Sequence, residues 1–263
     1  MNTVIYLHIA GFVIKITFTN INLSYFQSIF QKDILMFNEG FISKIKTKKV
    51  DFNLYFIGGQ KVFLSNKKKD VSISFYKIMD NKTIVSYYHI SRIQFILIIR
   101  YILTKLLGKN GIILHCSASV IQNKAYLFVG ASGVGKSTIS SLISNRHITL
   151  TDDIGIIRKI GNKLFFFQTP FFEKNDKIVR CSTKYNLGNL YFIHQSMRTN
   201  IKKLNSKIVL LKRIQNQAWT EKKEYSKDAH TFLLYFVTKH SRFFDLFFHK
   251  NNTELISNKI RSS

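Results

Sequence analysis

Residues 130–138 read GASGVGKST, between an apolar run, AYLFV at 125–129, and a helix-like segment, STISSLIS at 137–144. Glycines at this spacing let the backbone curl so that successive N–H groups point inward. The start of a helix brings its positive end to the same place. A strand, a glycine-rich loop and a helix in this order therefore predict a binding loop for phosphate groups.

The loop motif is complete, and each residue type has a chemical reason. Lys136 is expected to reach the β- and γ-phosphates of ATP, and the Ser137 hydroxyl to ligate Mg²⁺. A glycine-rich turn with a chance lysine is the alternative, and the agreement of both flanks argues against it. The residues expected to hold the nucleotide are Gly130, Ala131, Ser132, Gly133, Val134, Gly135, Lys136, Ser137 and Thr138.

Two adjacent carboxylates, Asp152 and Asp153, follow the short β-rich segment ITLT. Mg²⁺ prefers hard oxygen ligands. Neighbouring side chains on a strand point to opposite sides, so one aspartate could bind the metal and the other could accept a proton from an attacking hydroxyl. A charged turn without chemistry is the alternative. Glu173, in TPFFEK, is a further candidate for the metal.

A histidine, His115, stands in the otherwise apolar run ILHCSASV. A hydrogen-bonded core histidine is one interpretation. The other is a site residue, because its strand is expected to lie beside the strand that leads into the loop.

The chain is expected to form two domains, a β-rich subdomain at 1–90 and a nucleotide-binding domain at 91–263. The front part is predicted to be antiparallel, with turns at Gly11, at Gly58–Gly59 and at Asp80–Asn81. Apolar residues at helical spacing predict a helix over 91–108, with Ser91 as its cap. Further turns are expected at Gln122–Asn123 and Gly161–Asn162, a strand at 189–195, and a helical tail over 230–250.

The composition bounds the class of protein. The formal charge of +26 invites a nucleic-acid partner, but the cations are scattered, and a bias toward Lys, Asn, Ile and Phe is typical of AT-rich codons. No specific nucleic acid is therefore expected. No apolar run is long enough to span a membrane, and two distant cysteines indicate neither a disulfide framework nor a zinc site. A cytoplasmic protein fits best.

Residues 114–140, LHCSASVIQNKAYLFVGASGVGKSTIS, with LTDD at 150–153 and QTPFFEK at 168–174, resemble the catalytic domain of HPr kinase/phosphorylase. They resemble more closely the HPr-kinase-like proteins of bacterial peptide-modification clusters. The resemblance covers about residues 111–175. No stretch matches the EIRGxG signature of the true HPr kinase, so HPr as acceptor and the reverse reaction are not implied.

The resemblance implies an α/β (α+β) fold: a mixed-sheet P-loop domain related to phosphoenolpyruvate carboxykinase, with helices packed on the sheet. It also implies that Asp152 is the catalytic base, supported by His115, and that Lys136 holds the transferred phosphate. Asp153 and Ser137 would hold Mg²⁺.

The first functional hypothesis is an ATP-dependent kinase that acts on a serine hydroxyl of a peptide or small protein. The second is a nucleotide-binding regulator or an ATPase without an acceptor. A third, a basic nucleic-acid-binding protein, lacks a recognisable binding signature. The acceptor and the oligomeric state are not specified by the sequence.

Overall fold

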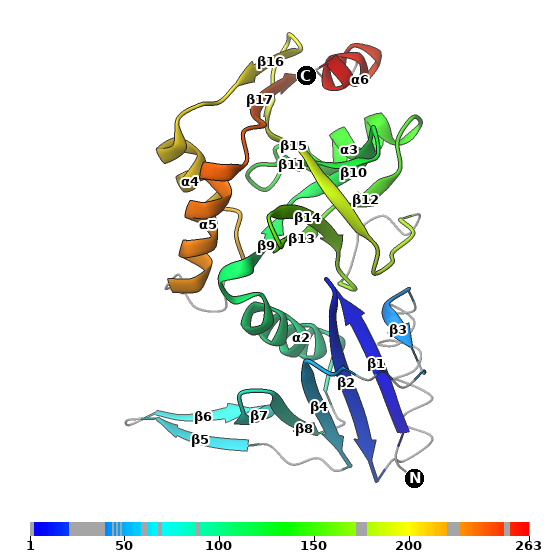
Figure 1. The fold of residues 1–263 in the computed structure, drawn as a ribbon, viewed down its shortest axis with the longest axis vertical. Coiled ribbons are helices and arrows are strands. Elements are labelled where there is room, and N and C mark those ends of the chain that lie inside the picture. The colour runs from blue at the N-terminus through cyan, green and yellow to red at the C-terminus, as the bar shows by residue number, and fades with distance from the viewer. Residues whose placement is uncertain are drawn as a thin grey trace. The chain divides into compact units, whose positions relative to one another are not determined.

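The structure is a computed structural model that describes residues 3–20, 40–43, 45, 47, 49–58, 63–67, 70–87, 90–171, 178–219, 227–249 and 253–262. Contacts within the chain divide it into two compact units, Met1–Leu106 and Leu107–Ser263 (Figure 1). The helix expected over 91–108 belongs to the first unit, so the division falls at the end of this helix and not before it.

The first unit contains a six-stranded sheet in the order β3-β1-β2-β4-β8-β7. Its strands are β1 (Thr3–Ile9), β2 (Phe12–Thr19), β3 (Ile42–Ser43), β4 (Phe52–Ile57), β7 (Tyr76–Asp80) and β8 (Thr83–Tyr87). A separate two-stranded ribbon consists of β5 (Phe63–Lys67) and β6 (Asp70–Ser74). The hairpins expected at Gly11 and at Asp80–Asn81 are confirmed, because β1 pairs with β2 and β7 with β8, both antiparallel.

The antiparallel arrangement expected for this unit is wrong at its centre. β2 pairs with β4 in parallel, and β4 pairs with β8 in parallel. Parallel neighbours need a crossover in place of a tight turn, and a long stretch of chain separates each of these two pairs. The hairpin expected at Gly58–Gly59 would pair β4 with β5. It is wrong, because β5 pairs with β6. Gly59 itself lies outside the described residues.

The predicted helix is present as α2 (Arg92–Leu107). Its start is a capping box: the Ser91 N–H donates to Gln94 Oε1 at 2.7 Å, and the Gln94 N–H donates to Ser91 Oγ at 3.2 Å. The helix packs on the sheet of its own unit, with the Phe95 ring centroid 6.2 Å from that of Phe56 on β4. These contacts explain why α2 belongs with the strands before it.

The second unit is built on a nine-stranded mixed sheet. The path runs β12-β10-β11-β15-β14-β13-β9, and β17 pairs with both β15 and β16. β11–β15 and β15–β17 are parallel and the other pairs antiparallel. The strands are β9 (Gly111–His115), β10 (Ser117–Ile121), β11 (Lys124–Val129), β12 (Thr149–Thr151), β13 (Ile154–Ile160), β14 (Lys163–Gln168), β15 (Lys184–Gln195), β16 (Asn200–Lys203) and β17 (Phe243–Phe248).

A mixed sheet within an α/β arrangement is therefore confirmed. The turns expected at Gln122–Asn123 and at Gly161–Asn162 are also confirmed, because they join β10 to β11 and β13 to β14, both antiparallel. The strand expected at 189–195 is the second half of β15. The first half of β15 pairs with β14 and the second half with β17, so this long strand connects both parts of the sheet.

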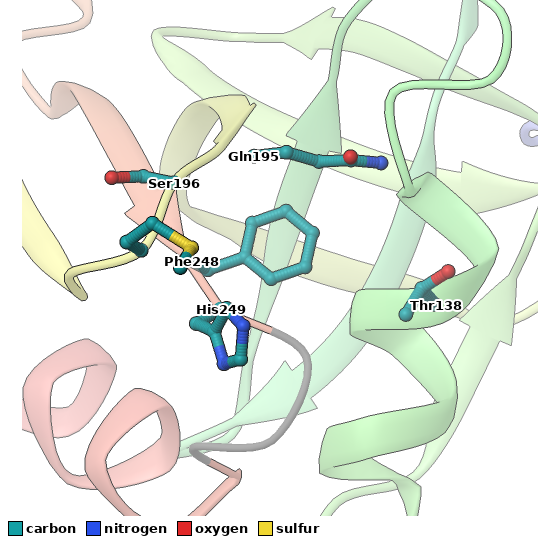
Figure 2. A pocket seen from close by; sticks show the side chains of 6 residues that line it. Thr138, Gln195, Ser196, Phe248 and His249 are labelled. Atoms are coloured by element: carbon teal, nitrogen blue, oxygen red, sulfur yellow. The ribbon is translucent and has the colours of Figure 1, made fainter.

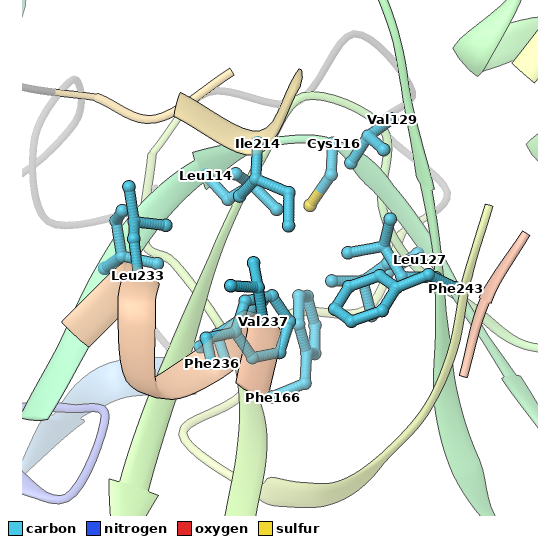
Figure 3. Packing of buried hydrophobic residues seen from close by; sticks show 14 of the residues in the cluster. Leu114, Cys116, Leu127, Val129, Phe166, Ile214, Leu233, Phe236, Val237 and Phe243 are labelled. Carbon is cyan, nitrogen blue, oxygen red and sulfur yellow. The ribbon is translucent and has the colours of Figure 1, made fainter. Parts of the chain in front are cut away.

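Helices pack on this sheet, as expected, and they cover both of its faces. One face carries α4 (Lys207–Gln215) and α5 (Lys227–Lys239), whose apolar residues form a buried cluster with strand residues such as Leu127 and Phe192 (Figure 3). The other face carries α3 (Lys136–Ser144) and α6 (Thr253–Ser262), which pack against residues such as Tyr191. Tyr191 and Phe192 alternate between the faces, as strand geometry requires. A short 3₁₀ helix, η3 (Gly108–Asn110), precedes β9.

The helical tail expected over 230–250 is wrong in its second half. α5 ends at Lys239, and FFDLFF forms β17. Its apolar residues are buried on both faces of the sheet, with Phe243 in the cluster under α5 and Leu246 in the cluster under α3. A strand buried on both faces reads as a continuous apolar run, which periodicity alone does not separate from a buried helix.

Two breaks between consecutive strands set the position of the site. β9 and β10 are separated by Cys116, and β12 and β13 by Asp152 and Asp153. The Cys116 N–H donates to the Asp153 carbonyl at 2.9 Å, which joins the two breaks. The strands at the two ends of the sheet path, β12 and β9, therefore come together at these breaks. β10, which begins at one of the breaks, is the neighbour of β11, the strand that leads into the phosphate loop.

Among the described residues, no helix combines the length and the apolar character needed to cross a membrane.

Candidate phosphate-loop active site

The glycine-rich loop lies between β11 and α3, as the sequence predicts. Gly133 and Gly135 have φ of +79° and +106°, a region that favours glycine. A Cβ on Gly135 would lie 2.8 Å from Cζ of the Phe248 ring. Conformation and space therefore both require glycine at Gly135, immediately before the helix.

The first turn of α3 has no side-chain cap. Gly135 occupies the N-cap position and supplies no side-chain hydrogen bond to the first N–H groups. An α-helix leaves its first four N–H groups without partners in the helix, and these groups attract anions together with the helix dipole. The start of α3 is thus suited to phosphate oxygens.

The Lys136 side chain lies inside the curl of the loop. Its Nζ donates to the carbonyl oxygens of Gly130 at 2.8 Å and Ala131 at 3.0 Å, and the residue is 7% exposed. The Ser117 hydroxyl on β10 donates to the Lys136 carbonyl at 3.1 Å, which fixes the start of α3 to the sheet. A buried ammonium of this kind acts strongly on a neighbouring anion because solvent screens it little.

The acidic turn is shaped by a buried hydroxyl, that of Thr151. The N–H groups of Asp153 and Ile154 donate to Thr151 Oγ1 at 3.3 and 3.2 Å. The Thr169 hydroxyl donates to the Ile154 carbonyl at 3.1 Å, and Gln168 Nε2 donates to the Leu150 carbonyl at 2.6 Å. The turn that carries Asp152 and Asp153 is therefore held from two sides.

His115 ends β9 and lies against this turn. Its Nδ1 is 3.1 Å from Asp153 Oδ1, and the side chains are 39% and 26% exposed. The expected position beside the loop strand is wrong, because β9 stands at the end of the sheet path and pairs with β13. The break at Cys116 explains the proximity to the site, since the chain passes directly from β9 into β10, the neighbour of β11.

One cavity of about 190 Å³ brings these features together. It is lined by His115, Ser132, Gly133, Gly135, Lys136, Ser137, Thr138, Asp152 and Asp153. Gly130, Ala131 and Val134 belong to the same loop but do not line this cavity. Glu173 lies outside the described residues. His115 contacts Asp153, and its expected support of Asp152 stays a prediction.

The oxygen donors of this cavity suit a Mg²⁺ ion that is bound together with phosphate groups. Among the described residues, no three His, Cys, Asp or Glu side chains are grouped as a metal site of their own. Mg²⁺ usually takes one or two carboxylates and completes its shell with water and substrate phosphates. The Ser137 hydroxyl and the carboxylates of Asp152 and Asp153 line one cavity and offer such hard oxygen ligands.

Sequence reasoning missed the residues that position the site. Ser117, Thr151, Gln168 and Thr169 act through hydrogen bonds to backbone and are almost fully buried. One signal was available: a threonine directly before two aspartates is typical of a hydroxyl-capped turn. Ser117 and Gln168 carry no comparable local signal, because their partners are 19 and 18 residues away.

No family model matches the sequence, and no curated protein matches it. Among solved structures, the HPr(Ser) kinase/phosphatase from Coxiella burnetii is similar to 57% of this chain and to 94% of its own chain. The identity is 12% and the TM-score 0.33.

Proposed function

We propose that this protein is an ATP-dependent kinase that transfers the γ-phosphoryl group to a serine hydroxyl of a peptide or small protein. The observation that carries the proposal is the cavity shared by the phosphate loop, Asp152, Asp153 and His115. A protein that only holds a nucleotide needs the loop and a metal ligand. A second carboxylate at the same place supplies the proton acceptor that transfer to a hydroxyl requires.

The loop residues would bind and orient the triphosphate. The N–H groups of the glycine-rich loop and of the first turn of α3 would contact phosphate oxygens, and Lys136 would neutralise charge at the β- and γ-phosphates. Ser137 and Asp153 would hold Mg²⁺, which would neutralise part of the phosphate charge when bound. His115, 3.1 Å from Asp153, would orient that carboxylate, as neighbours of metal ligands commonly do.

Asp152 would accept the proton of the serine hydroxyl. In this step a bond forms between the serine oxygen and the γ-phosphorus, and the bond from that phosphorus to the β–γ bridging oxygen breaks. The proton passes to Asp152, and ADP leaves with the bridging oxygen. Asp152 is 5% exposed, so little solvent competes for its carboxylate.

The test is incubation with γ-labelled ATP and Mg²⁺ in the presence of a serine peptide, with the matched alanine peptide as control. Peptides encoded beside the gene are the first choice, and acidic ones are favoured by the charge of +26. The expected product is phosphoserine in the serine peptide and none in the alanine peptide. Release of free phosphate alone would instead identify an ATPase without an acceptor.

A further inference from the structure

A second cavity of about 530 Å³ lies next to the phosphate loop (Figure 2). It is lined by Thr138, Gln195, Ser196, Met197, Phe248 and His249. Figure 2 shows Thr138 on α3 facing the rings of Phe248 and His249, which come from the end of β17. A volume of this size is typical of sites for small organic ligands.

The topology connects this cavity to the phosphate loop. β11, β15 and β17 run parallel to one another, so their carboxyl ends lie at one edge of the sheet. The loop follows β11, Ser196 and Met197 follow β15, and His249 follows β17. Thr138 lines both cavities. A molecule whose phosphates occupy the loop would therefore have its remaining part beside the larger cavity.

Direct contacts tie this cavity to the loop itself. Gly135 lies against the Phe248 ring, which is 2% exposed. Gln195 Nε2 donates to the Val134 carbonyl at 3.5 Å. Two lining residues of the larger cavity, Gln195 and Phe248, thus contact the phosphate loop directly.

The chemistry of the lining differs from that of the loop. The described lining residues include no lysine, arginine, aspartate or glutamate, although the chain has 40 lysines and arginines. They provide two aromatic rings, a thioether, an amide and two hydroxyls. Rings and a thioether stack on a flat heterocycle, and amide and hydroxyl groups hydrogen-bond to its edge or to a sugar. An uncharged heteroaromatic group with a sugar fits this set better than a further phosphate.

We infer that this cavity holds the base and ribose of the nucleoside triphosphate whose phosphates occupy the loop. The inference rests on the proposed function. The base lies against His249 and Met197, with Phe248 as the floor, and Gln195 and Ser196 supply hydrogen bonds.

The test compares two ligands, MgATP and the magnesium complex of inorganic tripolyphosphate, by calorimetry on the full chain. His249→Ala and Met197→Ala remove stacking partners, and Ser196→Trp fills the cavity. His230→Ala and Met79→Ala are matched controls, because both residues are exposed and neither lines this cavity. The unmodified protein should bind MgATP more tightly than tripolyphosphate.

Each cavity variant should weaken MgATP binding about tenfold or more, as loss of a stacked base does, and leave tripolyphosphate binding unchanged. Equal affinity of the unmodified protein for both ligands would overturn the inference. So would equal losses for both ligands in the variants, or unchanged MgATP binding in all three. If the protein binds neither ligand, both the proposed function and this inference fail. If it binds tripolyphosphate as tightly as MgATP, only this inference fails.

Discussion

Replacement of Lys136 by alanine should abolish most nucleotide-dependent activity. Lys136 is 7% exposed, so a charge pair between its ammonium and a phosphate oxygen at about 4 Å is worth about 4 kcal/mol at an effective dielectric constant near 20. Part of this gain is offset because the ammonium leaves its bonds to the Gly130 and Ala131 carbonyls. We therefore expect a loss of about 10²–10³ in turnover.

The assay combines calorimetry with MgATP and a measurement of phosphoryl transfer. Lys163→Ala is the matched control, since Lys163 is an exposed lysine at the start of β14. Lys136→Ala also leaves two loop carbonyls without their donor, so urea unfolding must show that the variant remains folded. Unchanged affinity and turnover in a folded Lys136→Ala protein would refute the role of the loop.

Three further predictions concern the carboxylates, a buried histidine and the core. Asp153→Asn should raise the Mg²⁺ concentration needed for activity. Asp152→Asn should leave MgATP binding intact and lower the rate of phosphoryl transfer by about 10²–10⁴. Identical Mg²⁺ titrations of the two variants would contradict these separate roles. Burial lowers the pKa of His240 from 6.5 to about 4, so the unfolded chain binds the proton first. This histidine should lower the free energy of unfolding by about 3 kcal/mol from pH 6.5 to pH 4. Urea unfolding at a series of pH values should show a smaller decrease for His240→Gln. Phe236→Ala should lower the free energy of unfolding by about 3–5 kcal/mol, because its ring, on α5, is fully buried in the cluster between this helix and the sheet. A loss below 1 kcal/mol would contradict this packing.

The sequence predicts correctly those features whose residues lie close together in the chain. The glycine-rich loop, the Ser91 helix cap and the turn at Gln122–Asn123 depend on residues a few positions apart, and the structure has all three. Both residues have a positive φ, as a two-residue hairpin turn requires, and asparagine adopts this region more readily than most residues do.

The pairing of distant strands was not predictable in the same way. The parallel pairs β2–β4 and β4–β8 depend on which strands meet after a long connection, and alternation of apolar residues does not specify this. The sequence predicts a helix where β17 stands, because burial on both faces removes the period of two. It places His115 on the strand beside the loop, because the break at Cys116 has no marker in the sequence.

Within the candidate site, the chemical groups were predictable and their supports were not. Lys136, Ser137, Asp152, Asp153 and His115 all line one cavity. Their roles stay predictions, and the 3.1 Å contact between His115 and Asp153 gives those predictions a geometry to test. The hydroxyl and amide groups that shape the turn act over long separations in sequence, so only a fold can identify them.

The most direct test of the central claim is the fate of the γ-phosphoryl group. The full chain, Mg²⁺ and γ-labelled ATP are incubated with a serine peptide, and the label is followed by mass spectrometry. The account predicts phosphoserine in the peptide, formed by the unmodified protein and reduced by about 10²–10⁴ in Asp152→Asn. Label found only in free phosphate, or peptide phosphorylation that Asp152→Asn leaves unchanged, would contradict it.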